Sequence, residues 1–291
     1  MTILVTGATG NIGSRILEKL DSAGVAVRAL TRSPEKAKLP RGVTAVKGDL
    51  LDADAMRTAL AGVSTLFLLV PNEADELTQA INSLSLAREA GVKGIVYLSV
   101  VRSDEFTDVP HFTAKYAAER QIEQLDLPAT ILRPSYFFQN DVQLKGALEA
   151  GFYPSPVGHK GVSMVDAGDI ADAATIELLR RERASSPLPR RIVEVSGPDA
   201  LTGPALAAIW SETLGREVRY TGDLDAFEKQ VRAFAPAWKA FDMRAMFRRY
   251  IEDGAVASPE HLRDFTSLLG RAPRSYRDFA AATARSWASR S

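Results

Sequence analysis

Residues 7–13 read Gly-Ala-Thr-Gly-Asn-Ile-Gly and separate an apolar strand-like segment from a segment with helical periodicity. A glycine pattern in this position is typical of the first turn of a dinucleotide-binding unit. Gly7 permits the tight turn, Gly10 lets the backbone approach a pyrophosphate, and Gly13 lets the helix pack close to the sheet. The N–H groups at the start of the helix then face the phosphates. The predicted phosphate-binding residues are Gly7, Thr9, Gly10, Asn11, Ile12 and Gly13.

Short apolar segments alternate with longer amphipathic ones as far as about residue 134. The expected strands are 3–6, 25–30, 43–47, 65–70, 95–99 and 129–132, and the expected helices are 12–23, 33–38, 54–60, 76–90 and 113–124. Continuous apolar strands alternating with helices indicate a parallel sheet covered on both faces. Right-handed crossovers then give the doubly wound order. The predicted fold class is therefore α/β, a doubly wound parallel sheet of the NAD(P)-binding Rossmann type.

The pattern loosens in the second half of the chain. We expect a loop over 151–161, a helix over 169–181 with Asp169 at its N-cap, a strand over 191–195 that returns to the main sheet, and a short strand within 217–220. The remainder after residue 197 is mostly helical. The sequence predicts a Rossmann domain over 1–155 and a smaller, mostly helical substrate-covering region over 156–291, interleaved because the segment near 169–195 returns to the first domain.

Composition excludes several classes of function. The charges balance, with 36 Lys and Arg against 36 Asp and Glu, so nothing indicates direct binding to nucleic acid or membrane. There is no cysteine, and the three histidines lie far apart, so no metal-ligand spacing is present. No apolar run approaches the roughly 18 residues of a membrane span. The first strand leaves no room for a targeting peptide, so we expect a cytoplasmic protein, with a homodimer left open.

The end of the second expected strand bears on the choice of cofactor. An NAD-specific site places Asp or Glu there, whereas this chain has Arg32, with Lys36 one turn further. A guanidinium at this point can pair with a 2′-phosphate and stack on adenine, which favours NADP(H) over NAD(H). The alternative is an arginine that is simply exposed to solvent. The residues expected around the adenine and its ribose are Asp49, Leu50, Leu69, Val70 and Pro71.

Several segments together resemble one known family. They are the glycine turn at 7–13, Thr-Arg-Ser-Pro at 31–34, Gly-Asp-Leu at 48–50, Tyr-Leu-Ser at 97–99, Thr-Ile-Leu-Arg-Pro at 130–134, Val-Asp-Ala-Gly-Asp-Ile-Ala at 165–171 and the C-terminal segment 269–279. The chain is similar over nearly its full length to the NmrA-like branch of the atypical short-chain dehydrogenases. Within that branch it resembles the NAD(P)H:quinone oxidoreductase and triphenylmethane reductase types.

The resemblance implies where the nicotinamide end of the cofactor should lie. Short-chain dehydrogenases use a Tyr-x-x-x-Lys pair with a serine on the preceding strand, and here Ser99 and Lys115 are in register with that scheme. The tyrosine position is occupied by His111. Residues four apart share a helix face, so His111 and Lys115 are candidate catalytic residues of one pocket, with Lys115 also holding the nicotinamide ribose. A purely structural His111 remains the alternative.

The segment after the sixth expected strand is rich in aromatic residues. Pro134, Tyr136 and Phe137 are expected at the nicotinamide end. Aromatic side chains there, helped by Phe152, Tyr153, Trp238, Phe241 and Met243, would form the wall of a site for a flat apolar substrate, unless they belong to the core. The sequence thus predicts an NAD(P)H-dependent oxidoreductase that transfers hydride directly to a flat acceptor such as a quinone or an aromatic dye. The alternative is a non-catalytic NAD(P)-binding redox sensor that acts through a protein partner.

Overall fold

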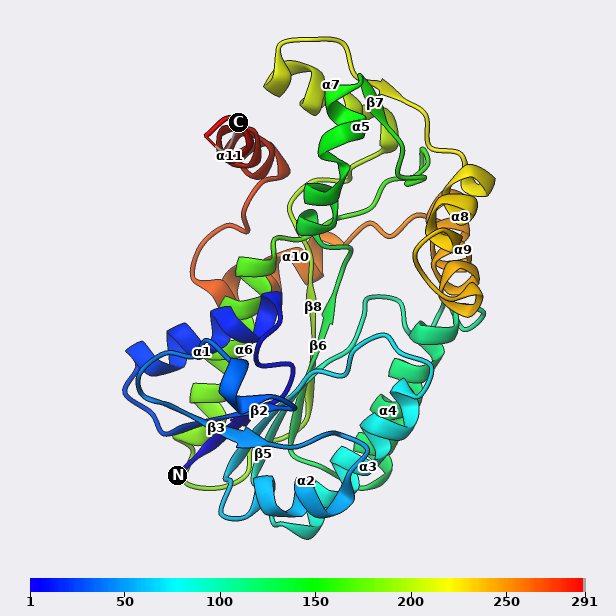
Figure 1. The fold of residues 1–291 in the computed structure, drawn as a ribbon. Coiled ribbons are helices and arrows are strands. Elements are labelled where there is room, and N and C mark those ends of the chain that lie inside the picture. The colour runs from blue at the N-terminus through cyan, green and yellow to red at the C-terminus, as the bar shows by residue number, and fades with distance from the viewer. Residues whose placement is uncertain (290–291) are drawn as a thin grey trace. The chain divides into compact units, whose positions relative to one another are not determined.

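Seven strands form one sheet in the order β3-β2-β1-β4-β5-β6-β8 in the computed structural model, which describes residues 1–289 (Figure 1). The strands are β1 (Ile3–Val5), β2 (Val27–Thr31), β3 (Val43–Lys47), β4 (Thr65–Leu68), β5 (Gly94–Leu98), β6 (Ala129–Pro134) and β8 (Arg191–Val195). Neighbouring strands from β3 across to β6 are parallel. The order reverses between β1 and β4, which confirms the predicted doubly wound α/β fold.

Helices cover both faces of this sheet (Figure 1). They are α1 (Asn11–Ser22), α2 (Ala53–Leu60), α3 (Glu76–Glu89), α4 (Pro110–Gln124) and α6 (Ala167–Glu182), with a short 3₁₀ turn at η1 (Pro34–Lys36). On one face α2, α3 and α4 contribute Met56, Leu84 and Ile122 to a single apolar core. On the other face α1 lies beside α6, where the ammonium of Lys19 is 2.6 Å from the carboxylate of Asp172. The central strands β1, β4, β5 and β6 are buried throughout, as their apolar sequences require, whereas β3 at the edge of the sheet is only partly buried.

The chain divides into two compact units. The first contains 1–104, 111–133 and 170–193, and the second contains 105–110, 134–169 and 194 onward. The second unit includes η2 (Phe138–Leu144), α5 (Lys145–Glu149), β7 (Phe152–Tyr153), α7 (Gly203–Leu214), β9 (Arg219–Tyr220), α8 (Leu224–Arg232), α9 (Ala237–Glu252), α10 (Pro259–Leu269) and α11 (Tyr276–Ala288). The domain boundary at residue 155 stays a prediction.

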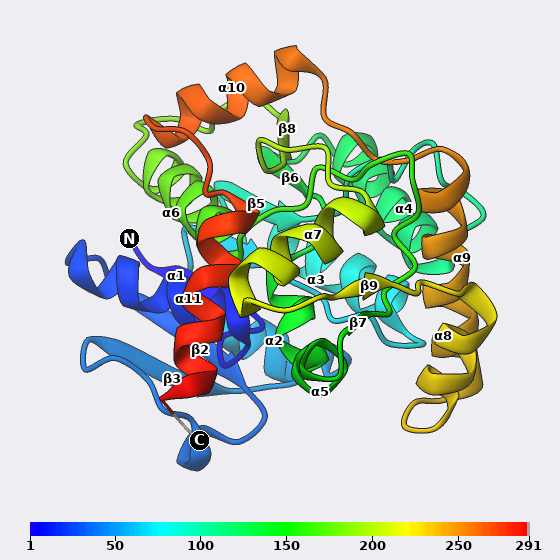
Figure 2. The ribbon, with the colours of Figure 1, turned by 90° about the horizontal axis from the view of Figure 1, so that it is seen from above.

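The structure corrects two expectations about secondary structure. The segment expected as a loop over 151–161 begins with strand β7, which pairs in parallel with β9 as Figure 2 shows. Helix α4 begins at Pro110 rather than near residue 113, because proline is well suited to the first turn of a helix, where its missing N–H is not needed. The short strand expected within 217–220 is confirmed as β9.

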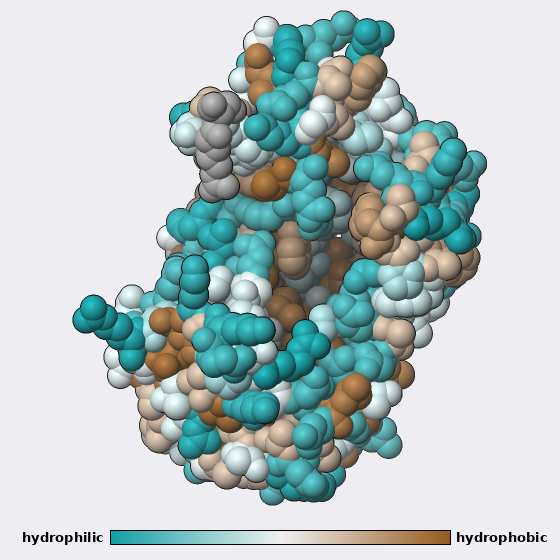
Figure 3. Space-filling model, viewed as in Figure 1, coloured by the Kyte–Doolittle hydropathy of each residue, from teal (hydrophilic) through white to brown (hydrophobic). Residues whose placement is uncertain are grey.

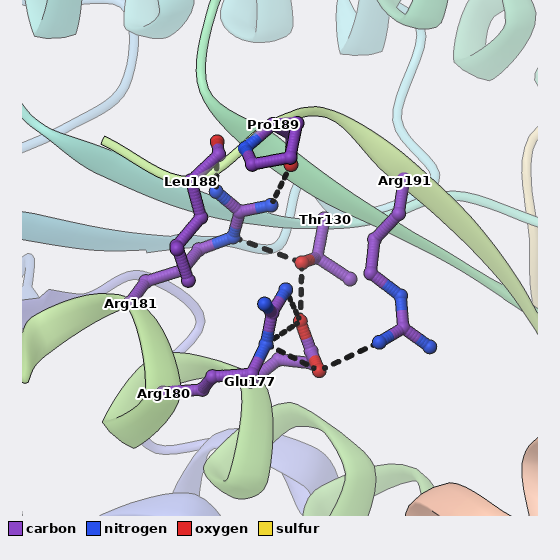
Figure 4. Close-up of polar contacts among 7 residues, drawn as sticks. All are labelled: Thr130, Glu177, Arg180, Arg181, Leu188, Pro189 and Arg191. Atoms are coloured by element: carbon purple, nitrogen blue, oxygen red, sulfur yellow. Dashed lines mark hydrogen bonds and ion pairs between the residues drawn. The ribbon is translucent and has the colours of Figure 1, made fainter. Parts of the chain in front are cut away.

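A polar cluster around the buried carboxylate of Glu177 holds α6 and β8 beside β6 (Figure 4). The hydroxyl of Thr130 donates to this carboxylate at 2.6 Å, and Arg180 and Arg191 lie 2.8 and 3.4 Å from it. Arg181 donates to Thr130 Oγ1 at 2.9 Å. Burial first, and then the neighbouring Arg180 charge, lower the pKa of Arg181 to about 10. The cluster thereby fixes α6 and β8, which come later in the chain, to β6 of the sheet.

Asp169 does not form the N-cap expected of it. Helix α6 begins at Ala167, so Asp169 lies in its first turn. Asp166 holds the helix start instead, because its Oδ1 accepts a hydrogen bond from the N–H of Gly168 at 2.7 Å. The buried Asp169 carboxylate accepts hydrogen bonds from Arg271 Nη2 at 2.6 Å and from the backbone N–H of residue 274 at 2.7 Å. Its role is to hold the segment between α10 and α11.

A second buried carboxylate organises the interior of the second unit. Asp141 in η2 accepts a hydrogen bond from Tyr153 Oη at 2.8 Å and another from the hydroxyl of Tyr276 at the start of α11. Trp210 donates in turn to Tyr276 Oη at 2.9 Å. Burial raises the pKa of Asp141 to about 6, although the two tyrosine hydrogen bonds act in the opposite direction. Tyr153 is therefore a core residue rather than part of a substrate wall.

We expect Asp141 to make the stability of the protein fall as the pH rises from about 4 to about 6. In this window the unfolded chain, whose aspartates titrate near 3.9, has released the proton that the folded protein still binds, so folding loses free energy as pH increases. The stabilisation is complete below about pH 4, and about 3 kcal/mol of it is lost once the pH exceeds the folded pKa of about 6.

Urea unfolding of Asp141→Asn and of the unmutated protein across this pH range measures the difference in their free energies of unfolding. Asp54→Asn, at an exposed position, is the control. A difference between Asp141→Asn and the unmutated protein that does not change with pH would contradict the assignment.

Candidate cofactor site

The glycine turn lies between the carboxyl end of β1 and the start of α1. Gly7 has φ of +59°, a backbone conformation that side chains disfavour. A Cβ on Gly13 would lie 2.2 Å from the carbonyl oxygen of Gly7, so α1 can approach the strand only with glycine there. A Cβ on Gly10 would meet the same oxygen at 3.3 Å and no other atom within 4 Å. The space over Gly10 is therefore open, as a turn that receives a pyrophosphate requires.

The N-terminus of α1 has the properties of an anion site. Its N-cap residue, Gly10, has no side chain to accept the first N–H groups, and the first turn contains no acidic residue. The twelve-residue helix therefore presents free N–H donors and the positive end of its dipole. This arrangement fits the phosphates of a dinucleotide.

A pocket of about 800 Å³ extends from the glycine turn along the carboxyl ends of β1 to β4. Its volume lies within the range of about 300–1,000 Å³ typical of small-molecule sites. Seven of the predicted cofactor residues line it: Gly7, Thr9, Arg32, Asp49, Leu50, Leu69 and Pro71. Gly10, Asn11, Ile12, Gly13 and Val70 adjoin these residues in the chain without being part of the lining, and Lys36 ends the neighbouring turn η1. The structure thus brings the predicted adenine and phosphate residues together.

Arg32 lies at the edge of this pocket, directly after β2. Its side chain is exposed, and within the described part of the chain no carboxylate forms an ion pair with it. Asp49, which the sequence also places here, is half-buried, and its Oδ1 accepts a hydrogen bond from the N–H of Leu51 at 3.0 Å. Arg32 is therefore the cation that the pocket offers to an anionic ligand group.

One wall of the pocket was missed by the sequence analysis. It is formed by the segment between β4 and α3 and by the first turns of α3, with Glu73, Ala74, Asp75 and Gln79. Gln79 Nε2 donates to Asp75 Oδ1 at 2.7 Å, which orders this wall. The only signal in the sequence is Pro71, which follows β4 and precedes a run of polar residues.

The residues predicted for the nicotinamide end lie near the carboxyl end of β5. Lys115 Nζ is 3.5 Å from the carbonyl oxygen of Leu98, the last residue of that strand, and 2.7 Å from Glu76 Oε1. His111 lies one turn earlier on α4, is half-buried, and contacts Phe112 edge to face at a ring distance of 4.6 Å. Neither candidate lines the 800 Å³ pocket. Their catalytic roles stay predictions.

Ser99 is buried, and its hydroxyl is already engaged. It donates to Glu119 Oε1 at 2.5 Å, and Ser103 donates to the same oxygen at 3.1 Å. Arg133 holds this carboxylate with two further hydrogen bonds, of 3.0 and 2.6 Å, and also contacts Asp104 at 2.9 Å. The serine can therefore offer a ligand only its lone pairs. The sequence analysis did not select Glu119. Only the structure shows that this charged residue occupies a buried position of α4.

The other predicted residues of the nicotinamide end belong to the second unit. Pro134 ends β6, and Phe137 forms a parallel bridge with Val165. The ring of Tyr136 lies 5.6 Å from that of Phe247 and 6.3 Å from that of Tyr250. Contact of the three residues with a cofactor stays a prediction.

Two general properties of the described residues bear on the class of protein. No helix among residues 1–289 combines the length and apolar character that crossing a bilayer requires. Over the same residues, no three His, Asp or Glu side chains are arranged to hold a metal ion.

Comparisons with known proteins agree with this geometry. The model of the NmrA-like family matches residues 1–259. The chain is 30% identical to an NAD(P)H azoreductase of Xenophilus azovorans, over 97% of this chain and 98% of that protein. It is 32% identical to a (4-alkanoyl-5-oxo-2,5-dihydrofuran-3-yl)methyl phosphate reductase of Streptomyces griseus, over 98% and 99%. The chain belongs to the NmrA-like family, as its motifs indicated.

Solved structures show the same fold. The NADPH-dependent quinone oxidoreductase of Escherichia coli, in complex with NADPH, superposes with a TM-score of 0.84 at 23% identity, covering 96% of this chain and 99% of that one. The triphenylmethane reductase of Citrobacter sp., in complex with NADP(H), gives 0.83 at 25% identity, covering 98% and 100%. The fold is therefore that of NAD(P)-binding proteins, and the chain is grouped with oxidoreductases.

We expect Gly10→Val to abolish nucleotide binding without unfolding the protein. The valine side chain would fill the open space above the turn and keep a pyrophosphate from the N–H groups of α1. The affinity for NADPH should fall by about a hundredfold or more, the size of one or two lost charge-assisted hydrogen bonds.

Calorimetric titration measures this loss of affinity, and circular dichroism checks that the variant is folded. Gly146→Val, in α5 where a Cβ meets no atom within 4 Å, is the matched control. Retained binding would show that the turn is structural only.

Proposed function

We propose that the chain is an NAD(P)H-dependent oxidoreductase that passes hydride from the nicotinamide directly to a flat acceptor such as a quinone or an aromatic dye. The observation that carries the proposal is the continuous pocket that runs from the glycine turn, at Gly7 and Thr9, to Arg32, which no carboxylate pairs with among residues 1–289. The cofactor, when bound, supplies the hydride, and the protein binds and orients it. The reductase names of the near full-length relatives support the class of reaction.

Arg32 supports the finer proposal that the cofactor is NADP(H) rather than NAD(H). A planar guanidinium without a carboxylate partner is suited to a 2′-phosphate, which it can bind through two parallel hydrogen bonds. The acidic residue that would hold the two ribose hydroxyls of NAD(H) is missing at the end of β2. Lys36, exposed at the end of η1, adds positive charge near the same edge.

The residues near β5 support an acceptor that needs no proton from a hydroxyl acid. In an ordinary short-chain dehydrogenase, tyrosine and serine hydroxyls serve the carbonyl oxygen. Here the tyrosine position is His111, and the hydroxyl of Ser99 donates to Glu119. A quinone or a cationic dye can accept hydride without such an acid. An ammonium has three donors, so Lys115 can bind the nicotinamide ribose while it remains paired with Glu76.

Exposed aromatic residues of the second unit support a flat, apolar acceptor. Phe234, Trp238 and Phe241, at the start of α9 and just before it, are 74%, 37% and 59% exposed. Figure 3 shows apolar residues at the surface beside hydrophilic ones over α8 and α9. Such side chains can stack on aromatic rings.

We expect unmutated protein to bind NADPH more tightly than NADH, and Arg32→Ala to remove this preference. Loss of a charge-assisted hydrogen bond should weaken NADPH binding about ten- to a hundredfold and leave NADH binding unchanged within about twofold. Titration of both nucleotides measures the effect. Arg41→Ala, an exposed arginine outside the pocket lining, is the control. Equal affinity of the unmutated protein for the two nucleotides would contradict the proposed preference.

The activity is tested with a panel of quinones and triphenylmethane or azo dyes. At least one acceptor should be reduced, with one NADPH consumed for each two-electron reduction. Deuterium at C4 of the nicotinamide should slow turnover where hydride transfer limits the rate. If tight NADPH binding occurs without reduction of any acceptor, the second candidate applies: a non-catalytic redox sensor that acts through a protein partner. NmrA, a negative transcriptional regulator solved in complex with NADP, shares the fold, with a TM-score of 0.78 at 20% identity.

A further inference from the structure

Glu76 and Lys115 form a largely buried ion pair beside β5. Glu76 is the first residue of α3 and its side chain is 3% exposed, whereas that of Lys115, in the middle of α4, is 13% exposed. The ammonium lies 2.7 Å from Glu76 Oε1 and 3.5 Å from the carbonyl oxygen that ends β5. The carboxylate thus fixes where the ammonium sits. No motif in the sequence links the two residues.

Unlike the surface ion pairs of this protein, this pair is largely shielded from solvent, so each charge depends on its partner for stabilisation. A buried charge is costly unless a partner of opposite sign compensates it. The neighbouring buried carboxylate, Glu119, has Arg133 as its own partner, with two hydrogen bonds between them. Glu76 is the carboxylate within ion-pair distance of Lys115, and the two opposite charges of the pair cancel.

The hydroxyl of Tyr97, on β5, is fully buried and has no hydrogen-bond partner among residues 1–289. Burial first, then the carboxylates of Glu76 and Glu119, raise the pKa of Tyr97 well above its ordinary value. Both carboxylates thus lie within electrostatic reach of the strand whose end Lys115 contacts.

We propose that Glu76 is the positioning and charge-balancing residue of Lys115. It holds the ammonium at the carboxyl end of β5 and cancels its charge, so that Lys115 can orient the nicotinamide ribose without placing a net positive charge beside the ring. This inference rests on the proposed function, because it assumes that a nicotinamide nucleotide binds with its ribose near Lys115.

Charge balance matters because the two redox forms of the cofactor differ in charge at the ring. The oxidised nicotinamide is cationic and the reduced one is neutral, so an uncompensated ammonium nearby would weaken binding of the oxidised form selectively. A residue that merely stabilises the fold would change the affinity for both forms by the same factor. The ratio of the two affinities therefore separates charge balance from structural support.

The test measures dissociation constants of NADPH and NADP⁺ for the full chain by calorimetric titration. Glu76→Gln keeps the shape of the side chain and removes its charge, and it should raise the NADP⁺ to NADPH ratio of dissociation constants about three- to tenfold. Lys115→Gln leaves the carboxylate and should lower the ratio by about threefold. The double variant should return the ratio to within about twofold of the unmutated value, because neutrality is restored. Glu89→Gln, an exposed glutamate at the other end of α3, is the matched control and should change nothing.

The outcomes are distinguishable. Equal weakening of both forms in Glu76→Gln, or an unchanged ratio in every variant, would overturn the inference while leaving the proposed function intact. If unmutated protein binds neither nucleotide, the inference and the proposed function both fail. If circular dichroism shows that Glu76→Gln does not fold, the opposite shift in Lys115→Gln and its reversal in the double variant decide the matter, and their absence counts against the proposal.

Discussion

The close approach of α1 to β1 is the constraint on which the cofactor site depends. A single Cβ at Gly13 would collide with the carbonyl oxygen of Gly7, so the helix can start where it does only because glycine occupies this position. That start aims uncapped N–H groups at the space over Gly10. The strand order reverses between β1 and β4, which leaves the crevice beside the turn uncovered and lets the pocket extend toward Arg32. The packing of α1 and the candidate anion site therefore depend on the same few backbone atoms.

The carboxyl end of β5 is organised by charge rather than by glycine. Glu119 on α4 engages Arg133 of β6 and the hydroxyl of Ser99, and Lys115, one turn earlier on the same helix, engages Glu76 of α3. Although burial acts to lower it, the hydrogen bonds to Glu119 raise the pKa of Arg133 further above its ordinary value, so this cation stays charged. Helix α4 is thus tied to β6 and to α3 by two largely buried ion pairs. The same contacts occupy the serine that other short-chain dehydrogenases use for catalysis.

The sequence predicts those parts of the structure that local patterns encode. Continuous apolar strands were enough for the doubly wound fold, and the spacing of Gly7, Gly10 and Gly13 was enough to place the glycine turn that borders the pocket. The pairing of Glu76 with Lys115 was not predictable, because with 36 acidic and 36 basic residues no spacing selects one pair. The contact of Asp141 with Tyr276 was equally inaccessible, since the two residues are brought together only by the fold. The expected N-cap at Asp169 failed for a local reason, because Asp166 competes for the same role.

The two ends of the candidate site use cations in opposite ways. Arg32 is exposed and unpaired in the described structure, so its full charge is available to an anionic group such as the 2′-phosphate of the proposed cofactor. Lys115 is largely buried and paired with Glu76, so in the proposed role it donates hydrogen bonds without imposing a field on a ring whose charge changes during the reaction. A site that carried two unpaired cations would bind the reduced nucleotide well and the oxidised one poorly at its nicotinamide end. If the nucleotide binds as proposed, this arrangement confines the attraction for charge to the adenine end, where the charge of the nucleotide does not change.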